Sequence, residues 1–460
     1  MSIHPPANGN HAIASPGRKV TPAAPWGDAL RLLPLFGFFA ILALVQAKGD
    51  NEGDGWRYLM NARHMLEGYF AAPDTLMFWN GPGYPILLIP FVALGIPLAL
   101  ARLLNAVFLY LAVVHFHGSL RLAGIGTRSL GYAYAMGVLL FLHGPLMGMI
   151  MTESLSAFLV CGAAWHLGAA SRGYGRKGLH ASLAGLHLGY LALTKVFFGY
   201  VVEFSLLVAA GLWLWARARK DPGTRASRLP PAIGPVPNRA PAAVVWACAV
   251  GMLVCMPWLG HTWSKTGKIN FWGNSGGFQM YYMSWPEKEY FGDWINFEAL
   301  LENPDFFRPH VEFVRETLKL DYVSQDGVLK KQAMRHCREH PGKCITNWRA
   351  NVNRMVFGYP VTHYPGSEVE LATGNRSLVY AFPFILCLLL AVPGWLGRRA
   401  VPAWVHYSLT FAILSLGGMS LVSAIPRQVF PVLPLLGLWC AVVAESALEI
   451  RGRWKHARPA

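Results

Sequence analysis

Charged residues are scarce in this sequence of 460 residues: Asp, Glu, Lys and Arg make up 14% of it, whereas hydrophobic residues make up 54%. The mean hydropathy is +0.33, and this balance argues against a soluble globular protein. Negatively charged residues are rarer than positively charged ones: the chain has 24 Asp and Glu against 40 Lys and Arg, so its formal net charge is +16.

Cysteine is also scarce, and seven cysteines are too few for a disulfide framework. Five of them lie in apolar stretches, where a small buried hydrophobe is the expected role: Cys161, Cys248, Cys255, Cys387 and Cys440. Cys337 and Cys344 instead share the polar stretch HCREHPGKC. In an oxidising compartment this pair predicts a short-loop disulfide. A zinc site with His336 and His340 is the alternative.

Long apolar stretches recur along the chain, as helices that cross hydrocarbon require. We count about ten candidate spans: 30–47, 98–117, 130–151, 154–170, 179–194, 196–215, 241–259, 377–396, 402–423 and 429–447. The first is not expected to be a signal peptide, because a polar tail precedes it and no small-residue cleavage site follows. The sequence therefore predicts an all-α polytopic membrane protein. No internal repeat is visible, so the inverted-repeat plan of many secondary transporters finds no support.

The basic residues predict the orientation of these spans. If the N-terminus is inside, the Lys and Arg of alternate connections and of the C-terminal tail all fall on the cytoplasmic side. They include Arg121, Arg128, Arg172, Arg176, Lys177, the run 217–239, Arg398, Arg399, Arg451, Arg453, Lys455 and Arg458. Most acids then face outward, and both termini are cytoplasmic. The positive net charge therefore reflects the orientation of the spans in the membrane and does not indicate nucleic-acid binding.

Five regions follow from these patterns. We expect a disordered cytoplasmic tail at 1–29, a transmembrane module at 30–259, an outside domain at 260–376, C-terminal spans at 377–447 and a basic cytoplasmic tail at 448–460. The module includes an outer loop at 48–97 with juxtamembrane helices and a Pro- and Gly-rich cytoplasmic linker at 216–240. The outside domain is expected to be small and mainly helical, with a break at Pro341–Gly342.

Four charged residues stand at outward ends of apolar segments: Asp54, Glu153, Lys195 and Arg427. Each has a plain structural alternative. Asp54 suits the N-cap of the helix predicted from residue 55, Glu153 can cap the fourth span together with Thr152, and both cations can snorkel to lipid headgroups. A capping carboxylate has a lowered pKa, which suits it to hold a cation or orient a hydroxyl.

If these four ends converge, acids and cations share one cavity at the outer membrane surface. Cations there would suit a phosphate leaving group. Carboxylates would suit an acceptor hydroxyl or a divalent metal. An ionisable residue at the membrane border is a functional candidate by default.

The order of motifs resembles the bacterial glycosyltransferase-C superfamily, in the branch of protein O-mannosyltransferases and lipid A aminoarabinose transferases, over roughly residues 30–445. Eight stretches carry the resemblance: DGWRYLMNARHMLEGYF, GPGYPILL, ARLLNAVFLY, MTESLSAF, LALTKVFF, MPWLGHTWSKTGKINFWGNSGGFQMYYMSWP, KKQAMRHCREHPGKCITNW and PRQVFPVLPLLGL. The Gly-Gly-Phe piece of the sixth stretch is expected to be strand-like. Asn80 stands near the place of a Lys in aminoarabinose transferases.

The resemblance implies an inverting transfer of a sugar from a polyprenyl-phosphate donor in the membrane to an unidentified hydroxyl acceptor. The donor would bind on the periplasmic or extracellular face of a bacterial inner membrane. Asp54 would activate the acceptor and Glu153 would assist it, while Lys195 and Arg427 would contact the donor phosphate. The substrate cavity would include Tyr58, Asn80, Tyr84 and Arg102. No cofactor is certain, and a divalent cation (Mg or Mn), if one is required, would bind Asp54 and Glu153.

Two other functions compete with a transferase. A transporter or flippase of lipid-linked sugars predicts charges near the middle of the membrane, whereas the ionisable residues here gather at the outer ends. A glycan polymerase or ligase needs a large basic outer loop, and the acidic segment 287–326 does not match that.

Overall fold

The computed structural model describes residues 25–46, 54–143, 147–218, 240–365, 375–398, 400–422 and 424–456. Every regular element in these ranges is a helix. Within the same ranges, seven helical segments are long and apolar enough to cross a membrane: Gly27–Val45, Leu98–Leu122, Glu153–Arg172, Phe197–Trp215, Pro241–Thr266, Arg376–Leu396 and Pro426–Glu449. The predicted all-α polytopic class is therefore confirmed.

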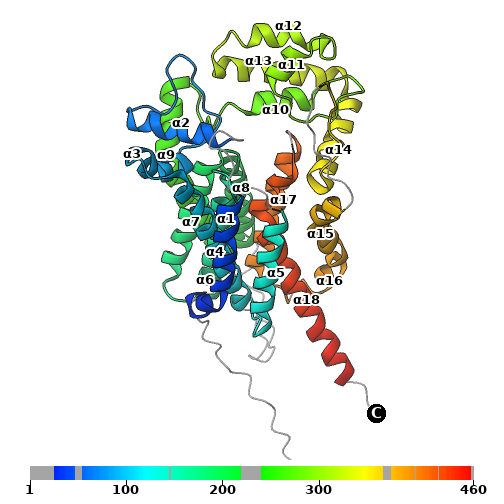
Figure 1. Ribbon diagram of the computed structural model, residues 1–460. Coiled ribbons are helices and arrows are strands. Elements are labelled where there is room, and N and C mark those ends of the chain that lie inside the picture. Colours follow the sequence, from blue (N-terminus) through cyan, green and yellow to red (C-terminus); the bar gives the residue numbers. More distant parts are fainter. Residues whose placement is uncertain are drawn as a thin grey trace, which may run out of the picture.

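The membrane body is a bundle of helices that run between two ends of the molecule (Figure 1). Its elements are η1 (Pro25–Leu32), α1 (Leu33–Val45), α4 (Leu98–Leu122), α5 (Arg128–His143), α6 (Glu153–Arg172), α7 (Lys177–Thr194), α8 (Phe197–Ala218), α9 (Ala240–Thr266), α15 (Asn375–Leu389), α16 (Ala391–Leu396), α17 (Ala403–Ser420) and α18 (Leu433–His456). Each predicted span overlaps helices of this bundle, although 377–396 covers both α15 and α16, and α5 ends at His143 rather than at 151. The helices α5, α7 and α17 also belong to the bundle, but they are not among the seven long apolar segments.

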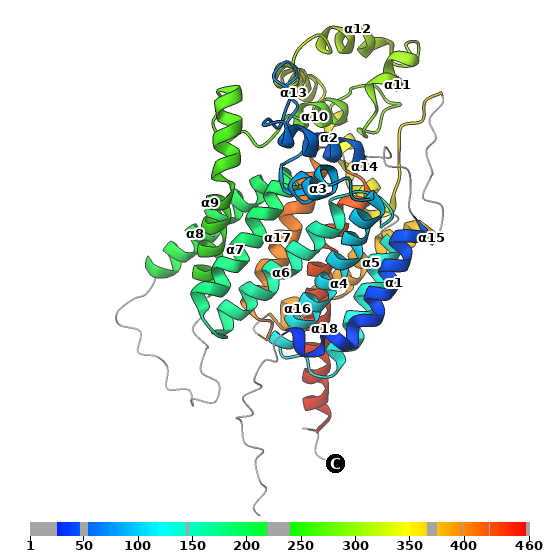
Figure 2. The ribbon, with the colours of Figure 1, turned by 60° about the vertical axis from the view of Figure 1, so that its left-hand side comes forward.

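The remaining helices lie at the end of the bundle opposite the C-terminal end of α18 (Figures 1 and 2). They are α2 (Gly55–Leu66), α3 (Gly83–Ala93), α10 (Gly276–Met283), α11 (Phe297–Glu302), α12 (Arg308–Thr317), α13 (Tyr322–Glu339) and α14 (Pro341–Phe357). We call residues 276–357, which hold α10 to α14, the cap. Two short 3-10 turns, η3 (Pro426–Gln428) and η4 (Phe430–Val432), lead from this end into α18.

Local chemistry explains how the cap helices begin and end. Asp321 caps α13, because its carboxylate accepts hydrogen bonds from the backbone N–H groups of Val323 and Ser324. The chain breaks before Pro341, whose ring cannot continue a helix but suits the first position of a new one. Cys337 and Cys344 form a disulfide across this break. An aromatic core fills the cap, with Trp285 stacked on His310 at 3.9 Å between ring centroids.

Two expectations differ from the structure. Residues 25–29, expected in a disordered tail, belong to η1, because Asp28 pairs with the buried His117 and the hydroxyl of Tyr110 donates to the carbonyl of Ala29. The Gly-Gly-Phe piece begins the helix α10 rather than a strand, and Gly277 N–H donates to Asp326. Most of the expected tail, the linker from 219 to 239 and the end of the basic tail after 456 lie outside the described residues.

The helices α7 and α9 pack closely through glycines spaced four residues apart. A Cβ atom on Gly185 would lie 2.5 Å from the carbonyl oxygen of Ala247, and one on Gly189 would lie 2.7 Å from that of Gly251. Small residues at this spacing let two helix backbones approach each other in a membrane. The contact holds α7 in place, and α7 ends next to Lys195.

Gly189→Ala is expected to lower the free energy of unfolding by about 1–3 kcal/mol, because the added methyl group would push α7 away from α9. Thermal unfolding of the purified protein in detergent would measure the loss. Gly178→Ala is the matched control on the same helix, since nothing lies within 4 Å of a Cβ there. Equal stability of the two variants would show that the close approach does not stabilise the fold.

Candidate functional site

Asp54 and Arg427 form an ion pair at the cap end of the membrane body, although 373 residues separate them in sequence. The Nη2 atom of Arg427 lies 3.0 Å from Oδ2 of Asp54, and Arg57 pairs with the other carboxylate oxygen. Asp54 precedes α2, but its side chain makes no capping hydrogen bond. The capping role considered for Asp54 is therefore wrong, because two guanidinium groups hold its carboxylate instead.

The electrostatic surroundings keep Asp54 ionised. Burial raises the pKa of its carboxyl, but the nearby cations of Arg427, Arg57 and Lys195 outweigh burial and hold the pKa below the ordinary value of 3.8. Hydrogen bonding from Arg427 acts in the same direction. The charged form of Asp54 is therefore the resting form at neutral pH.

Glu153 and Lys195 form a second ion pair, with 3.0 Å between Oε1 and Nζ. Glu153 opens α6, and its side chain is only 4% exposed. Lys195 lies in the break between α7 and α8, where the backbone is extended, so its side chain can leave both helices. Thr152 makes no side-chain capping bond at the start of α6. The Thr152 hydroxyl lies 3.5 Å from Oε2 of Glu153 and donates to it, so Lys195 is the charged partner of this buried carboxylate and Thr152 a neutral one.

The two ion pairs belong to one charged cluster. The Lys195 ammonium is close enough to Asp54 to lower its pKa. Burial raises the pKa of the Tyr58 phenol, and the carboxylates of Asp54 and Glu153 raise it further. Three cations, from Arg57, Lys195 and Arg427, face two carboxylates in this cluster. One positive charge is left over for an anion.

A cavity of about 520 Å³ opens between this cluster and the cap. Its wall comes from segments far apart in sequence: Asp54, Arg57, Trp79, Asn80, Ser275, Gln279, Asp293, Trp294, Arg354, Val361, Thr362, Tyr364, Ile425, Arg427 and Gln428. Its volume lies in the range of small-molecule binding sites. The wall therefore combines Asp54, Arg57 and Arg427 at the membrane body with aromatic and amide groups from the cap and the loop before α3. The cap also contributes the charged residues Asp293 and Arg354.

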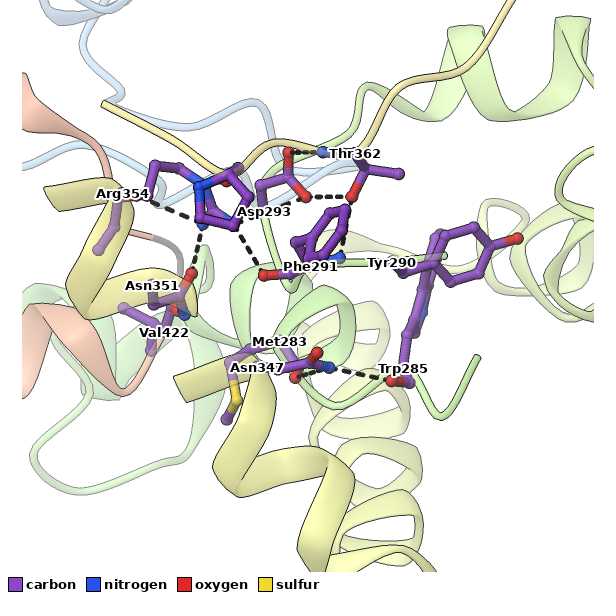
Figure 3. A network of polar contacts seen from close by, with 12 residues as sticks. Met283, Trp285, Tyr290, Phe291, Asp293, Asn347, Asn351, Arg354, Thr362 and Val422 are labelled. Atoms are coloured by element: carbon purple, nitrogen blue, oxygen red, sulfur yellow. Dashed lines mark hydrogen bonds and ion pairs between the residues drawn. The ribbon is translucent and has the colours of Figure 1, made fainter. Parts of the chain in front are cut away.

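Arg354 ties the wall of this cavity together (Figure 3). Its guanidinium is buried and donates to the carbonyl oxygens of Pro360 and Phe291, at 2.7 Å each, and to the side chain of Asn351. Asp293 lies 3.8 Å from the guanidinium and accepts hydrogen bonds from the backbone and hydroxyl groups of Thr362. Because its guanidinium is buried and donates to these protein groups, Arg354 fixes the shape of the cavity wall.

Only some of the predicted site residues line the cavity. Asp54, Arg427 and Asn80 line the cavity, whereas Glu153 and Lys195 lie outside its lining and act on it through charge. Three residues predicted for the substrate cavity are buried and not among its lining residues: Tyr58, Tyr84 and Arg102. The rings of Tyr58 and Tyr84 pack edge to face at 5.1 Å, so both support α2 and α3.

Sequence reasoning missed several residues of the site. Arg57 could have been found, because it follows Asp54 at the i, i+3 spacing that favours pairing on a helix. No such signal marked Asp293, Trp294 and Arg354. They lie in a long polar region, and no local sequence pattern predicts how that region packs against the membrane body.

A divalent cation does not fit the charged cluster as it stands. Both carboxylate oxygens of Asp54 bond guanidinium groups, and Glu153 is held by Lys195. In the described ranges, no group of three or more His, Cys, Asp or Glu side chains is arranged to hold a metal. We therefore assign no step to a metal.

Lys195→Met is expected to lower the free energy of unfolding by about 2 kcal/mol, because Glu153 would keep a buried charge without its partner. Thermal unfolding in detergent would measure it. The double variant Lys195→Met, Glu153→Gln should recover most of the loss, since neither charge remains. A double variant as unstable as the single one would show that Lys195 does not act through Glu153.

Comparisons with known proteins give no family by sequence, since no family model and no curated protein matches the chain. Three solved structures align with it. The Archaeoglobus fulgidus oligosaccharyltransferase tethered with an acceptor peptide is 11% identical, over 95% of this chain and 52% of the other, with a TM-score of 0.46. The oligosaccharyltransferase AglB of the same organism, in complex with an inhibitory peptide and a dolichol-phosphate, is 13% identical, over 95% and 53%, with a TM-score of 0.46.

The third structure is ArnT from Cupriavidus metallidurans bound to undecaprenyl phosphate, 14% identical over 92% of this chain and 78% of the other, with a TM-score of 0.35. The chain spans about half the length of the oligosaccharyltransferases. At these scores the alignments carry no argument about activity, substrate or partners. The aligned proteins are members of the glycosyltransferase-C superfamily, which is also the superfamily that the motifs of this sequence resemble.

Proposed function

We propose that this chain is an integral-membrane glycosyltransferase that moves a sugar from a polyprenyl-phosphate-linked donor to a hydroxyl acceptor, with inversion. One observation carries the proposal. A cavity at one end of the membrane body contains the pair Asp54–Arg427 in its wall, next to the pair Glu153–Lys195, with one excess positive charge.

The excess charge suits a phosphate at the membrane border. A lipid-linked donor keeps its tail in the hydrocarbon, so its phosphate stays near the ends of the helices, where Arg427 and Lys195 lie. The Arg427 side chain is 35% exposed and can exchange a carboxylate for a phosphate. Fixed cations next to the leaving group stabilise the charge that it gains as the sugar departs.

The carboxylate of Asp54 faces the acceptor in this scheme. The acceptor oxygen forms a bond to the anomeric carbon while the bond from that carbon to the phosphate oxygen breaks, and the electron pair leaves with the phosphate. Attack opposite the leaving group inverts the anomeric centre. The acceptor hydroxyl donates a hydrogen bond to Asp54. Because the lowered pKa makes this carboxylate a weak base, the proton passes to it only as the new bond forms and the hydroxyl becomes acidic. Protonation weakens the pair with Arg427 and leaves that cation to the phosphate.

We place the cavity on the periplasmic or extracellular face of a bacterial inner membrane, with both termini in the cytoplasm. The basic connections support this orientation. Arg121 and Arg128 flank the turn between α4 and α5, and Arg172 and Lys177 flank the turn between α6 and α7. Both turns lie at the end of the bundle away from the cap (Figure 1), as the positive-inside rule expects of cytoplasmic loops.

Proteoliposomes that contain the purified chain and polyprenyl-phosphate sugars would test the function. We expect release of polyprenyl phosphate and appearance of the sugar on an added acceptor extract. The alternatives are separable in the same preparation. A flippase would move the intact donor between leaflets without breaking its bond to the sugar, and a polymerase or ligase would transfer a preassembled glycan chain. Donor movement with no cleavage would overturn the transferase.

A further inference from the structure

The cap side of the cavity has a different chemistry from the charged side, and it is the part that no step of the proposed reaction uses. Trp294 presents a side chain that is 40% exposed, and Gln279 lines the same wall. Trp79 and Asn80 extend this wall toward the charged cluster. Asp293 and Arg354 also line the cavity on the cap side, but Arg354 donates to Phe291 and Asp293 accepts from Thr362, so their charges are bound within the protein. The groups of this wall that remain for a ligand are aromatic rings and amides.

Trp294 is held as a rigid platform. The ring of Trp79 meets it edge to face at 5.8 Å, and the ring of Tyr282 does so at 5.5 Å. The preceding residue, Asp293, is fixed by hydrogen bonds from Thr362. An exposed indole held in place by perpendicular rings offers a flat apolar face at low conformational cost. The C–H face of a pyranose ring has the matching shape and polarity.

Hydrogen-bonding groups beside this platform lack protein partners. Within the described residues, the Nε1 of Trp79 and the Nδ2 of Asn80 are buried without a hydrogen bond, and Gln279 lines the same cavity. Buried polar groups of this kind are costly unless a ligand or water satisfies them. Two amides and an indole N–H suit a neutral ligand with several hydroxyl groups.

Two side chains, Trp79 and Arg57, link Trp294 to the carboxylate of Asp54. The guanidinium of Arg57 lies over the ring of Trp79 at 5.1 Å and pairs with Asp54. A ring bound on Trp294 and Asn80 would therefore present a hydroxyl group toward Asp54. The donor sugar, in contrast, must stay with its phosphate at the membrane border.

We propose that the acceptor is a carbohydrate, which binds with one sugar face on Trp294 and with its hydroxyl groups on Gln279 and Asn80. This inference rests on the proposed transferase function for the role of the site, but the binding of a sugar does not. A lipid acceptor would need an apolar path that this wall lacks, and a peptide acceptor is an outcome of the test.

Binding can be measured without the donor. The full chain in lipid nanodiscs, studied by saturation-transfer NMR with trisaccharides of glucose, mannose or galactose, should bind at least one of the three. We expect Trp294→Ala to weaken that binding by about tenfold and Trp294→Phe to retain most of it. Trp263→Ala is the matched control, because Trp263 is 56% exposed and is not among the residues that line the cavity.

Kinetics with an active donor distinguish binding of the acceptor sugar at Trp294 from binding of the donor sugar there. Trp294→Ala and Gln279→Ala should raise the KM for the acceptor and leave the KM for the donor unchanged. A rise in the donor KM alone would overturn the proposal, since the subsite would then hold the donor sugar. So would transfer to a peptide or lipid at the same rate in wild type and Trp294→Ala. Trisaccharide binding that depends on Trp294, without any transfer, would support the sugar subsite and overturn the transferase.

Discussion

Asp54→Asn is expected to lower sugar transfer by about 10²- to 10⁴-fold, because the amide can still occupy the site but cannot accept the proton of the acceptor hydroxyl. The variant should still fold, since the Asp54 and Arg427 side chains are partly exposed, at 22% and 35%, and such pairs contribute little to stability. Initial rates of transfer in proteoliposomes, with thermal unfolding of the same preparations, would measure both effects.

Asp74→Asn is the matched control, because Asp74 is exposed in the segment between α2 and α3 and does not line the cavity. The pH profile gives a second check. The pKa of Asp54 lies below 3.8, so its carboxylate stays charged as the pH falls through 5, and the rate should not drop there on account of Asp54. Full turnover of Asp54→Asn would exclude Asp54 from the chemistry.

Arg354→Ala is expected to lower the free energy of unfolding by about 3–5 kcal/mol, the typical loss when one partner of a buried ionic network is removed. The guanidinium is 1% exposed, and it joins α14 to the carbonyl oxygens of Pro360 and Phe291. Without it, Asp293 would be left buried beside unpaired carbonyl groups. Thermal or denaturant unfolding in detergent would measure the loss.

Arg349→Ala is the control on the same helix, because Arg349 is exposed and its loss should change stability by less than about 0.5 kcal/mol. Arg354→Lys should not restore stability, since an ammonium group cannot reach the separate acceptors that the planar guanidinium joins. If Arg354→Ala were as stable as Arg349→Ala, the network of Figure 3 would not hold the cavity wall.

Several features could be read from local patterns. The spans follow from hydropathy, because a helix in hydrocarbon must satisfy its backbone internally and bury apolar side chains. The break at Pro341 and the pairing of Cys337 with Cys344 follow from short-range chemistry. The charged ends of the apolar segments, such as Glu153 and Lys195, were visible for the same reason.

The role of each charge within the site was not readable in this way. Asp54 looked as much like an N-cap as a site residue, because both roles place a carboxylate before a helix. The choice depends on Arg427, which lies 373 residues away in sequence. Trp294 had no local signal, since an aromatic residue in a polar segment is ordinary. Gln279 lies in one of the stretches that carry the family resemblance, but nothing in that stretch indicates that its amide faces a cavity.

The sequence by itself determined that this chain is an all-helical membrane protein, where most of its spans lie and which charged residues stand at their ends. These properties depend on hydropathy and on neighbours within a few turns of helix. Only the tertiary structure decided that Arg57 and Arg427 share Asp54, that Tyr58 and Tyr84 are buried supports, and that the cap closes a cavity with an aromatic wall. The physical reason is that burial and ion pairing depend on contacts between distant segments, which no local pattern records.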